Sequence, residues 1–311
     1  MIDIVGLAHE SGFSACFVLP PDNFTCYKRR QADGVLHAQG QHLCAEPTLD
    51  YPWANALILL LWPYRPYRQD ACTAGAYYAA SNEAYHAART LAKRLAARGV
   101  RAEQVYVPVR ELALRNGVGT MCKNGLTAFE NYGTRVAVQV LAASVPDVMY
   151  EPVRPMRTCP DCGNCQSVCP VHAIGKDGFD YQKCMRAHMG KDVLPDWVMQ
   201  NLESMLGCEL CQYACPLNAG IVPLEGVPEA FEVGQILETG VKELTALIGP
   251  NQNGGGRILC HAAVLAARQG RRDLLPALQR LTDDPREPVK AAAIYAISLL
   301  QGMGDCDTMI E

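Results

Sequence analysis

The stretch that decides the fold runs from Cys159 to Pro170 and reads CPDCGNCQSVCP. A second run, CELCQYACP, spans Cys208 to Pro216, and Cys184 stands alone between the two. The first run has the spacing C-x2-C-x2-C-x3-C-P, in which three thiolates wrap one cubane in a short loop and the fourth reaches a neighbouring cluster. This spacing predicts iron-sulfur clusters and therefore indicates electron transfer.

The eight cysteines of these segments supply enough ligands for two [4Fe-4S] clusters. The predicted ligands are Cys159, Cys162, Cys165 and Cys215 for the first cluster, and Cys208, Cys211, Cys169 and Cys184 for the second. The spacing resembles that of bacterial two-cluster ferredoxins. We therefore expect a ferredoxin-like domain over residues 151–225.

Two other uses of cysteine fit the sequence less well. A disulfide framework requires an oxidising compartment, yet no apolar signal segment opens the chain and no apolar run is long enough to span a bilayer. Zinc sites are usually built from paired C-x2-C knuckles rather than from a triple run followed by C-P. Reduced cysteines and oxygen-sensitive clusters together predict a cytoplasmic, low-oxygen location without a membrane partner.

Composition sets wide limits on the function. The chain has 311 residues, 49% of them hydrophobic, which is enough for two or three domains. Its formal net charge of -4 provides no general attraction for polyanions, so a nucleic-acid contact would require a local basic patch.

Residues 1–150 alternate apolar runs with a helical pattern. ACFVL near the start, NALILLLW at 55–62 and VYVPV at 105–109 read as strands, and the segment 83–99 reads as a helix that ends at Gly99. Such alternation predicts an α/β domain.

A glycine-rich stretch follows these elements. Gly117-Val118-Gly119 leads through Lys123-Asn124-Gly125 into further apolar chain. Glycines at this density let the backbone approach a ligand closely or adopt positive φ. An ordinary tight turn explains a lone G-x-G equally well.

Two segments together resemble the epoxyqueuosine reductase family. GVGTMCKNGLTAFENYG is similar to that family's G-x-G-x-x-G-K-N/H stretch, with matches at Gly117, Gly119, Lys123, Asn124, Leu126 and Gly133. YYAASNEAYHAARTLAKRL is similar to its Y-A-x-G-x-D-Y-H element, with matches at Tyr78, Ala79, Tyr85 and His86. The order of the eight cysteines also agrees.

The resemblance implies a flavin-reductase-like α/β domain that holds base-off cobalamin beside these matched residues. It further implies that an external low-potential donor of the ferredoxin or flavodoxin type passes electrons through both clusters to cobalt. The family uses reduced cobalt to remove the epoxide oxygen of epoxyqueuosine in transfer RNA, which is therefore an expected partner. A flavin in the same pocket stays an alternative, because flavin enzymes share the implied fold.

The chain departs from the family pattern where a D-T-x-P segment is usual. Here residues 105–108 read VYVP, so the presumed proton-donating aspartate is absent. Tyr106 and Glu111 are the candidate catalytic replacements, with the nearby Glu103 as a further possibility, since a phenol or a carboxyl group can act as a general acid when its pKa is suitable. The alternative is that Tyr106 packs in a strand and that Glu111 is a solvated surface residue.

A second departure is Cys122, which stands where the family commonly has glycine. Its thiol could face the corrin ring or simply fill space, and packing is the interpretation we favour because free cysteine is often buried.

Residues 226–311 are predicted to be helical. Apolar residues at helical spacing within 258–270, 273–284 and 288–300 suggest a short HEAT-like region. Its charges roughly balance, and a single repeat is more often a packing cap than a binding arm.

Four histidines are candidate ligands: His86, His172, His188 and His261. None lies in a D-x-H-x-x-G motif, so cobalt without a protein ligand is the expectation. The sequence leaves two functions open. One is a cobalamin-dependent reductase of an organic substrate such as a modified nucleoside, and the other is a non-catalytic electron-transfer or corrinoid-handling protein.

Overall fold

The chain forms two compact units, the first made of residues 1–64 and 80–162 and the second of residues 65–79 and 163–311. The computed structural model describes residues 2–32, 43–68, 74–155, 157–190 and 193–307. The domain limits predicted at residues 150 and 225 stay predictions.

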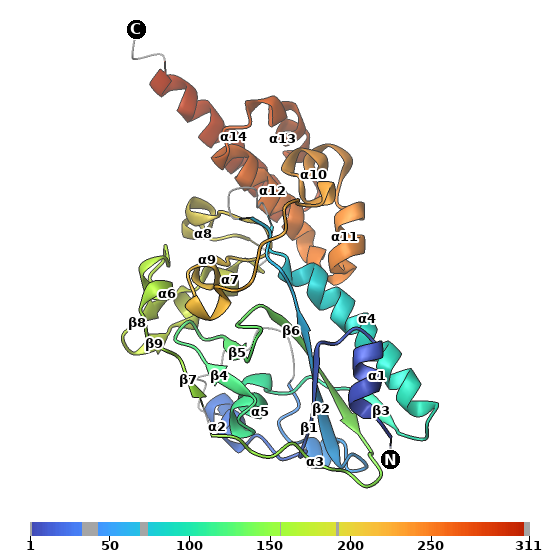
Figure 1. The fold of residues 1–311 in the computed structure, drawn as a ribbon. Coiled ribbons are helices and arrows are strands. Elements are labelled where there is room, and N and C mark those ends of the chain that lie inside the picture. Colours follow the sequence, from blue (N-terminus) through green and yellow to red (C-terminus); the bar gives the residue numbers. More distant parts are fainter. Residues whose placement is uncertain (1, 33–42, 69–73, 156, 191–192, 308–311) are drawn as a thin grey trace. The chain divides into compact units, whose positions relative to one another are not determined.

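The first unit is built around a four-stranded sheet (Figure 1). Its elements are α1 (Ile4–Glu10), β1 (Ala15–Leu19), α2 (Thr25–Ala32), α3 (Pro47–Asp50), β2 (Ala56–Pro63), most of α4 (Tyr77–Ala96), β3 (Ala102–Gln104), α5 (Val109–Arg115), β4 (Gly119–Met121), β5 (Thr127–Phe129), β6 (Val136–Ala143) and β7 (Arg157–Thr158). The sheet has the strand order β1-β2-β6-β3, and all of its neighbouring strands are antiparallel.

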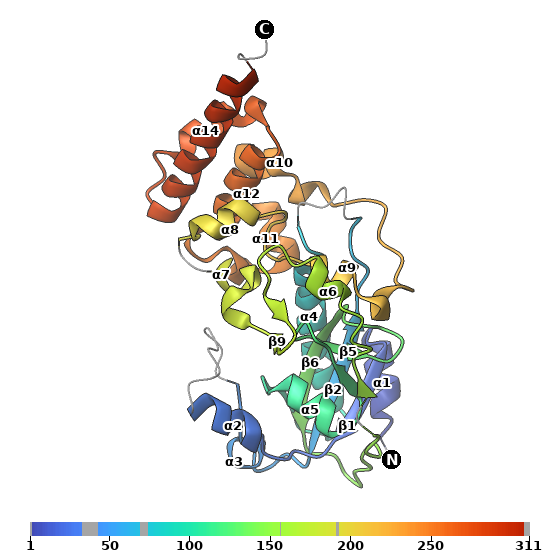
Figure 2. The ribbon, with the colours of Figure 1, turned by 90° about the vertical axis from the view of Figure 1, so that its left-hand side faces the viewer.

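Strand β2 is the centre of this unit because both of its faces are covered. Leu57, Leu59 and Leu61 join the hydrophobic core together with Leu112 of α5. Ile58, between them, is equally buried and points to the opposite face of the sheet, because successive strand residues alternate. Helices α1 and α4 lie alongside the sheet (Figure 2). A strand covered on both faces reads as a continuous apolar run, which is why ALILLL shows no alternation.

Most of the predicted elements of this unit are confirmed. ACFVL forms β1, and the apolar run at 55–62 forms β2. The predicted helix is α4, which begins at Tyr77 rather than at residue 83, and Gly99 beyond its end has φ +80°.

The strand predicted at 105–109 is wrong. β3 ends at Gln104, and α5 begins at Val109 with Pro108 as its N-cap. Proline has no N–H for a strand ladder and is well suited to the start of a helix, so the VYVP segment links the two elements as a loop.

A smaller sheet holds the glycine-rich stretch. β4 pairs with β5 in antiparallel fashion and with β7 in parallel fashion, so that Thr120 lies opposite Arg157 and Met121 opposite Thr158. The pairing with β7 places β4 beside the chain that leads directly into Cys159.

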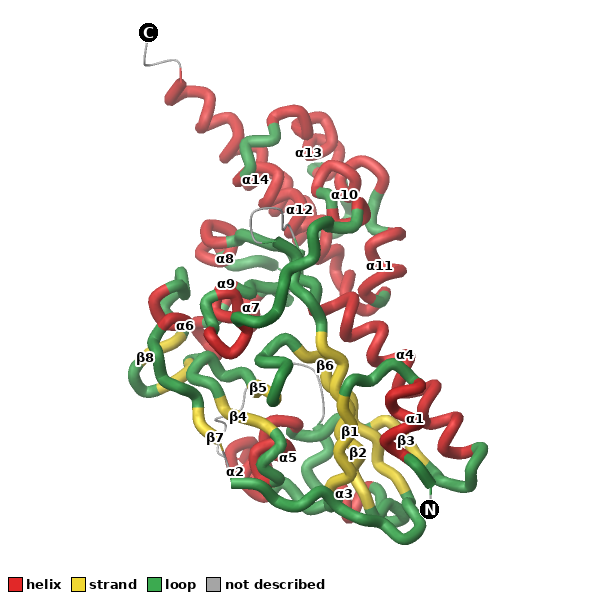
Figure 3. Tube along the Cα trace, in the orientation of Figure 1, coloured by secondary structure: helices red, strands yellow, loops and turns green. Residues whose placement is uncertain are grey.

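The second unit contains the remaining cysteines and the C-terminal helices. Its elements include α6 (Asn164–Ser167), β8 (Ile174–Gly175), β9 (Gly178–Phe179), α7 (Met185–His188), α8 (Asp196–Asn201), α9 (Leu210–Tyr213), α10 (Val233–Thr239), α11 (Lys242–Ile248), α12 (Arg257–Arg268), α13 (Leu275–Leu281) and α14 (Glu287–Asp307), with short 3₁₀ turns at Tyr181–Lys183, Pro216–Asn218, Glu229–Phe231, Pro250–Gly256 and Arg272–Leu274. Between residues 163 and 228 the helices are short, and loops make up much of the chain (Figure 3).

Helix α12 is the core of the C-terminal helices. Every side chain from Ile258 to Ala267 is buried, and α12 packs against α10 and α14. The predicted helices of this region are confirmed, and their HEAT-like arrangement stays a prediction. Within the described part of the chain, no helix has the length and apolar character needed to cross a membrane.

Candidate metal centre and cofactor stretch

Three of the cysteines predicted to bind the second cluster, Cys169, Cys184 and Cys208, are in the second unit and influence one another electrostatically. Among the described residues, no group of three or more Cys, His, Asp or Glu side chains is arranged to hold a single metal ion. The charge of Cys169 acts on the thiol of Cys184, and the charges of Cys184 and Cys169 both act on Cys208. The three residues come from separate loops, one after α6, one before α7 and one before α9. The fold therefore gathers cysteines that are up to 39 positions apart in the sequence.

Backbone N–H groups surround these sulfur atoms. The N–H of Ala173 donates a hydrogen bond to Sγ of Cys169, with a distance of 3.3 Å between nitrogen and sulfur. This bond closes the turn that follows the C-P pair. Hydrogen bonds to cluster sulfurs are one of the ways in which a protein sets a cluster's reduction potential.

The thiols are held in surroundings that disfavour a bare thiolate. Burial raises the pKa of Cys208 to about 11, against a smaller lowering by the N–H of Leu210. Burial also raises the pKa of Cys184, which the N–H groups of Arg186 and Ala187 partly oppose. A positively charged cluster iron would stabilise the thiolate, because a thiol that coordinates a metal releases its proton to the solvent.

Cys211 is on α9, three residues after Cys208, which precedes the helix. Its position on the helix that begins beside Cys208 suits the fourth ligand of the second cluster. Its assignment to that cluster stays a prediction.

Two of the cysteines predicted for the first cluster are also in the second unit. Cys165 on α6 and Cys215 after α9 are both buried, and α6 packs against α9. Nδ2 of Asn164 donates to the carbonyl oxygen of Ala214 at 3.4 Å, so residues adjacent to both cysteines are in contact. The two thiols therefore belong to one packed region of the unit.

The other two cysteines of that set, Cys159 and Cys162, end the first unit. Asp161 between them has a left-handed backbone, with φ +51°. Its carboxylate accepts a hydrogen bond from Nζ of Lys123, with an Oδ1–Nζ distance of 2.6 Å. The lysine of the glycine-rich stretch is thus joined to the loop that carries these two cysteines.

The glycines of that stretch are required by the protein's own packing. Gly117 has φ +66°, and a Cβ there would lie 2.1 Å from the carbonyl oxygen of Arg154. A Cβ on Gly119 would lie 2.7 Å from the side chain of Thr127 and 2.9 Å from that of Ala113. Gly133, with φ +58°, closes a turn in which its N–H donates to the carbonyl oxygen of Phe129.

The turn after β4 contains Cys122 and Asn124. Cys122 is buried, and its carbonyl oxygen accepts a hydrogen bond from the N–H of Gly125. The packing interpretation of its thiol stays a prediction. Asn124 is only 4% exposed, and its Oδ1 accepts a hydrogen bond from the N–H of Leu126. Its Nδ2 is buried and has no hydrogen-bond partner among the described residues.

The two candidate acids of the first unit are not brought together. Oε2 of Glu111 accepts a hydrogen bond from the backbone N–H of Tyr27 at 3.0 Å, which fixes the start of α2. Tyr106 is 50% exposed, and its partial burial raises the pKa of its phenol, with a further contribution from Tyr85. Tyr85 in turn packs edge-on against His86, with ring centroids 5.3 Å apart.

Tyr78, predicted to contact the cofactor, lies in the second unit. Its hydroxyl accepts a hydrogen bond from the guanidinium group of Arg186, and burial raises its pKa despite that nearby positive charge. The described contacts of Tyr78 therefore place it beside α7, the helix that follows Cys184.

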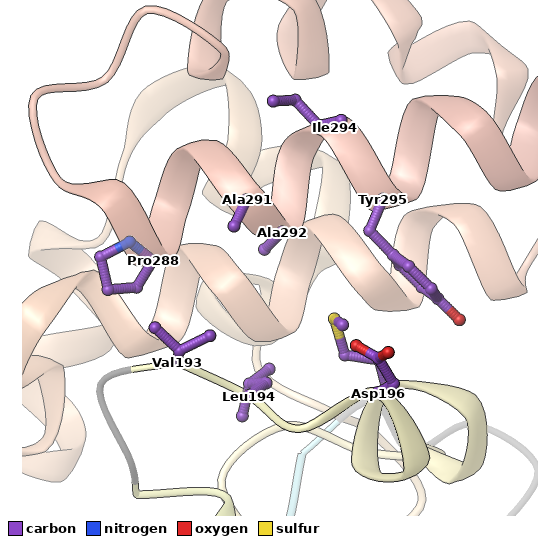
Figure 4. A pocket seen from close by; sticks show the side chains of 9 residues that line it. Val193, Leu194, Asp196, Pro288, Ala291, Ala292, Ile294 and Tyr295 are labelled. Atoms are coloured by element: carbon purple, nitrogen blue, oxygen red, sulfur yellow. The ribbon is translucent and has the colours of Figure 1, made fainter.

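A separate apolar cavity of about 390 Å³ lies between α14 and the chain that enters α8 (Figure 4). It is lined by Val193, Leu194, Asp196, Met199, Pro288, Ala291, Ala292, Ile294 and Tyr295. None of the predicted site residues lines it.

Sequence reasoning missed two connections. No role was assigned to Asp161 from the sequence, and His261 was considered only as a possible ligand. No local pattern signals either contact, because each joins residues that are far apart in the sequence. A buried histidine within an apolar helix was nevertheless a sign that the ring has polar partners.

The family model for the 4Fe-4S double cluster binding domain matches residues 158–218. This range contains all eight cysteines of the two predicted cluster sites. The fold and the cysteine segment therefore define a two-cluster iron-sulfur protein.

Several curated proteins are similar to this chain in sequence. The chain is 30% identical over 209 residues to the epoxyqueuosine reductase of Staphylococcus aureus strain NCTC 8325 / PS 47, covering 62% of this chain and 54% of that protein. It is 28% identical over 204 residues to the epoxyqueuosine reductase of Bacillus subtilis strain 168, covering 60% and 52%. These matches span about half the length of the curated relatives.

Solved structures agree in fold. A crystal structure of epoxyqueuosine reductase with an epoxyqueuosine-modified tRNA stem loop has a TM-score of 0.80 at 21% identity, covering 96% of this chain and 89% of that one. The epoxyqueuosine reductase from Streptococcus thermophilus has a TM-score of 0.74 at 20% identity, covering 99% and 94%. The chain is thus similar to epoxyqueuosine reductases in part of its sequence and in its fold, in agreement with the resemblance of its motifs.

Proposed function

We propose that this protein is an iron-sulfur reductase that passes electrons through two [4Fe-4S] clusters to a bound cobalamin and on to a modified nucleoside of transfer RNA. The observation that carries the proposal is the cysteine segment matched by the 4Fe-4S double cluster binding domain model, in which Cys169, Cys184 and Cys208 influence one another electrostatically. Together with Cys211 they form the second cluster site, and Cys159, Cys162, Cys165 and Cys215 form the first.

One feature of the first unit supports a bound cofactor. The buried Nδ2 of Asn124 lacks a partner among the described residues, and a buried donor left unpaired costs about 1–3 kcal/mol. An acceptor group on cobalamin would satisfy it. Bound cobalamin would supply a metal centre that accepts electrons from the clusters and reduces an organic substrate.

The roles of the other residues follow from their positions. Lys123 holds the cofactor stretch to the loop of the first cluster through Asp161. Tyr85, His86 and Cys122 are in the same unit, and Gly117, Gly119 and Gly133 shape its backbone. Tyr78, in the second unit, is hydrogen-bonded to Arg186.

Tyr106 is the candidate to replace the absent aspartate. Because its pKa is raised, its phenol keeps the proton at neutral pH and can donate a hydrogen bond to a substrate. Complete proton transfer would require its pKa to fall. Glu111 is a weaker candidate, since its carboxylate already accepts the N–H of Tyr27.

The proposed substrate is a transfer RNA, because one structure of similar fold holds an epoxyqueuosine-modified stem loop. The proposed electron donor is a low-potential ferredoxin or flavodoxin, and the proposed location is the cytoplasm. With a net charge of -4, RNA contact would depend on a local basic surface, and its affinity would fall as salt rises.

Anaerobic reconstitution with iron and sulfide, followed by titration with hydroxocobalamin and its one-electron reduction to cob(II)alamin by a chemical reductant, tests the proposal. The expected result is about eight irons per chain and one equivalent of cobalamin with the cobalt EPR spectrum of the base-off form. Reduced protein should then convert epoxyqueuosine-containing transfer RNA to the queuosine form, detected by mass spectrometry of the nucleosides.

A second candidate function is a non-catalytic electron carrier or corrinoid-handling protein. It is favoured by the absence of an aspartate from residues 105–108 and by the packing that accounts for Gly117 and Gly119 without a cofactor. Full iron loading with no corrin binding would establish the electron carrier. Corrin binding without any conversion of the nucleoside would favour corrinoid handling.

A further inference from the structure

The buried histidine of α12 contacts two segments of the second unit that carry predicted cluster ligands. The N–H of Leu206 donates to Nδ1 of His261, with a nitrogen–nitrogen distance of 3.1 Å. Nε2 of the same ring lies 3.1 Å from the carbonyl oxygen of Met189. Leu206 precedes Cys208 by two residues, and Met189 follows Cys184 by five.

These two contacts fix the protonation state of the ring. A backbone N–H can only donate, so Nδ1 of His261 must accept, and the proton of the neutral ring is on Nε2, from which it donates to Met189. The side chain is 0% exposed, and burial lowers its pKa to about 3, with Arg257 acting in the same direction. His261 is therefore neutral at physiological pH, with both ring nitrogens in use.

The segment that His261 holds has an unusual backbone. Leu206 has φ +65°, which leucine rarely adopts, and its side chain is 98% buried. Such a conformation is strained for leucine and persists only where its surroundings determine it. The hydrogen bond to Nδ1 is one such determinant, and it lies immediately before Gly207 and Cys208.

We propose that His261 is a positioning residue for the second cluster, holding the loop of Cys208 and the α7 segment of Cys184 at a fixed separation. This inference rests on the proposed assignment of those cysteines to one cluster. It gives the C-terminal helices a role in the redox centre, because the residue that holds both segments belongs to α12.

The two hydrogen bonds can be separated by substitution. In His261→Asn, Oδ1 takes the position of Nδ1 and can still accept from Leu206. In His261→Gln, the side-chain amide takes the position of Nε2 and can still donate to Met189. His261→Leu keeps an apolar volume and removes both bonds. Cys260→Ala, at a buried neighbour on the same helix, is the matched control for a general disturbance of α12.

The measurements are iron per chain after anaerobic reconstitution and the two cluster potentials followed by EPR. We expect Cys260→Ala to retain about eight irons and unchanged potentials, and His261→Leu to lose up to about four irons. His261→Asn should stay closer to the parent protein than His261→Gln does, because it retains the bond nearest to Cys208. In His261→Gln the potential of one cluster should shift while the other stays constant.

The proposal is overturned if His261→Leu melts at a lower temperature but keeps its irons and both potentials. If His261→Leu does not fold, equal potentials for the Asn and Gln variants and the parent protein overturn it instead. Failure of the parent protein itself to load eight irons would count against the proposed function, and that result is distinct from a failure of the variants alone.

Discussion

The cysteine segment and the glycine-rich stretch both match their motifs closely, but the structure supports them in different ways. In the cysteine segment, Cys169, Cys184 and Cys208 come from three loops and influence one another electrostatically, and burial raises the pKa of Cys184 and Cys208. In the glycine-rich stretch, Gly117 and Gly119 are explained by neighbouring protein atoms. A motif strongly supports a bound cofactor only where the packing of the protein itself does not already explain why those residues are needed.

The largest expected effect is on the cysteine segment. Replacing both Cys184 and Cys208 with alanine removes two predicted ligands of one cluster, so the iron content should fall from about eight to about four per chain. Iron and sulfide assays after anaerobic reconstitution measure this loss. Cys26→Ala, at an exposed cysteine outside the segment, is the control and should keep the full content. Retention of eight irons by the double variant would contradict the ligand assignment.

The next largest effect distinguishes packing from cofactor binding in the glycine-rich stretch. Gly117→Ala combines positive φ with a Cβ 2.1 Å from the carbonyl oxygen of Arg154, and should lower the free energy of unfolding by roughly 2–5 kcal/mol. Gly99→Ala also has positive φ but meets no atom within 4 Å, and should cost only about 1 kcal/mol. Urea unfolding of the cofactor-free protein measures both. A stable Gly117→Ala protein that has lost only corrin binding would restore the cofactor interpretation.

The same contrast explains which parts of the structure could be predicted from the sequence. The strands at 15–19 and 55–62 were predictable because their apolar runs are local, and the spacing of the cysteines carried the cluster assignment. The strand expected at 105–109 was not, because Val and Tyr favour strands while Pro108, four positions on from the end of β3, starts a helix.

The contacts that hold the candidate site together could not be predicted from local sequence patterns. His261 meets Leu206 across 55 positions, and Lys123 meets Asp161 across 38. Such pairs depend on tertiary packing rather than on periodicity or spacing. The sequence therefore gives the types of ligand, whereas the groups that hold them appear only in the folded chain.

A third prediction concerns the pH dependence of the cysteine-bearing unit. Burial lowers the pKa of His261 from 6.5 to about 3, so below pH 6.5 the unfolded chain binds a proton that the folded chain refuses. The free energy of unfolding should therefore fall with decreasing pH, by up to about 1.4 kcal/mol per unit between about 6.5 and 3. In His261→Asn this contribution disappears, so the difference between the parent and the variant should change with pH. Parallel stability curves, from urea unfolding between pH 7.5 and 5.5, would contradict the assignment of a neutral buried ring.

A fourth prediction addresses the one feature of the glycine-rich stretch that packing does not explain. Asn124→Ala removes the buried Nδ2 that has no partner in the described chain, and also the acceptor for the N–H of Leu126. If Nδ2 binds the cofactor, cobalamin affinity should fall about tenfold, equivalent to about 1.4 kcal/mol. Titration followed by absorption measures this change. Thr120→Ala, on the neighbouring strand, is the control. Unchanged affinity in the Asn124 variant would remove the main support for a corrin at this site.

The smallest expected effect lies where the two regions meet, at the ion pair between Lys123 and Asp161. The lysine side chain is 17% exposed but the aspartate is 70% exposed, so solvent screens the pair and Lys123→Gln should cost less than about 1 kcal/mol. Thermal unfolding at low and high salt measures this, and Lys28→Gln, which breaks the pair with Glu46, is the matched control. If Lys123 has only this structural role, corrin affinity should change as little in Lys123→Gln as in the control. A large loss of affinity with unchanged stability would instead assign the lysine to the cofactor, and would make the glycine-rich stretch a binding site in its own right.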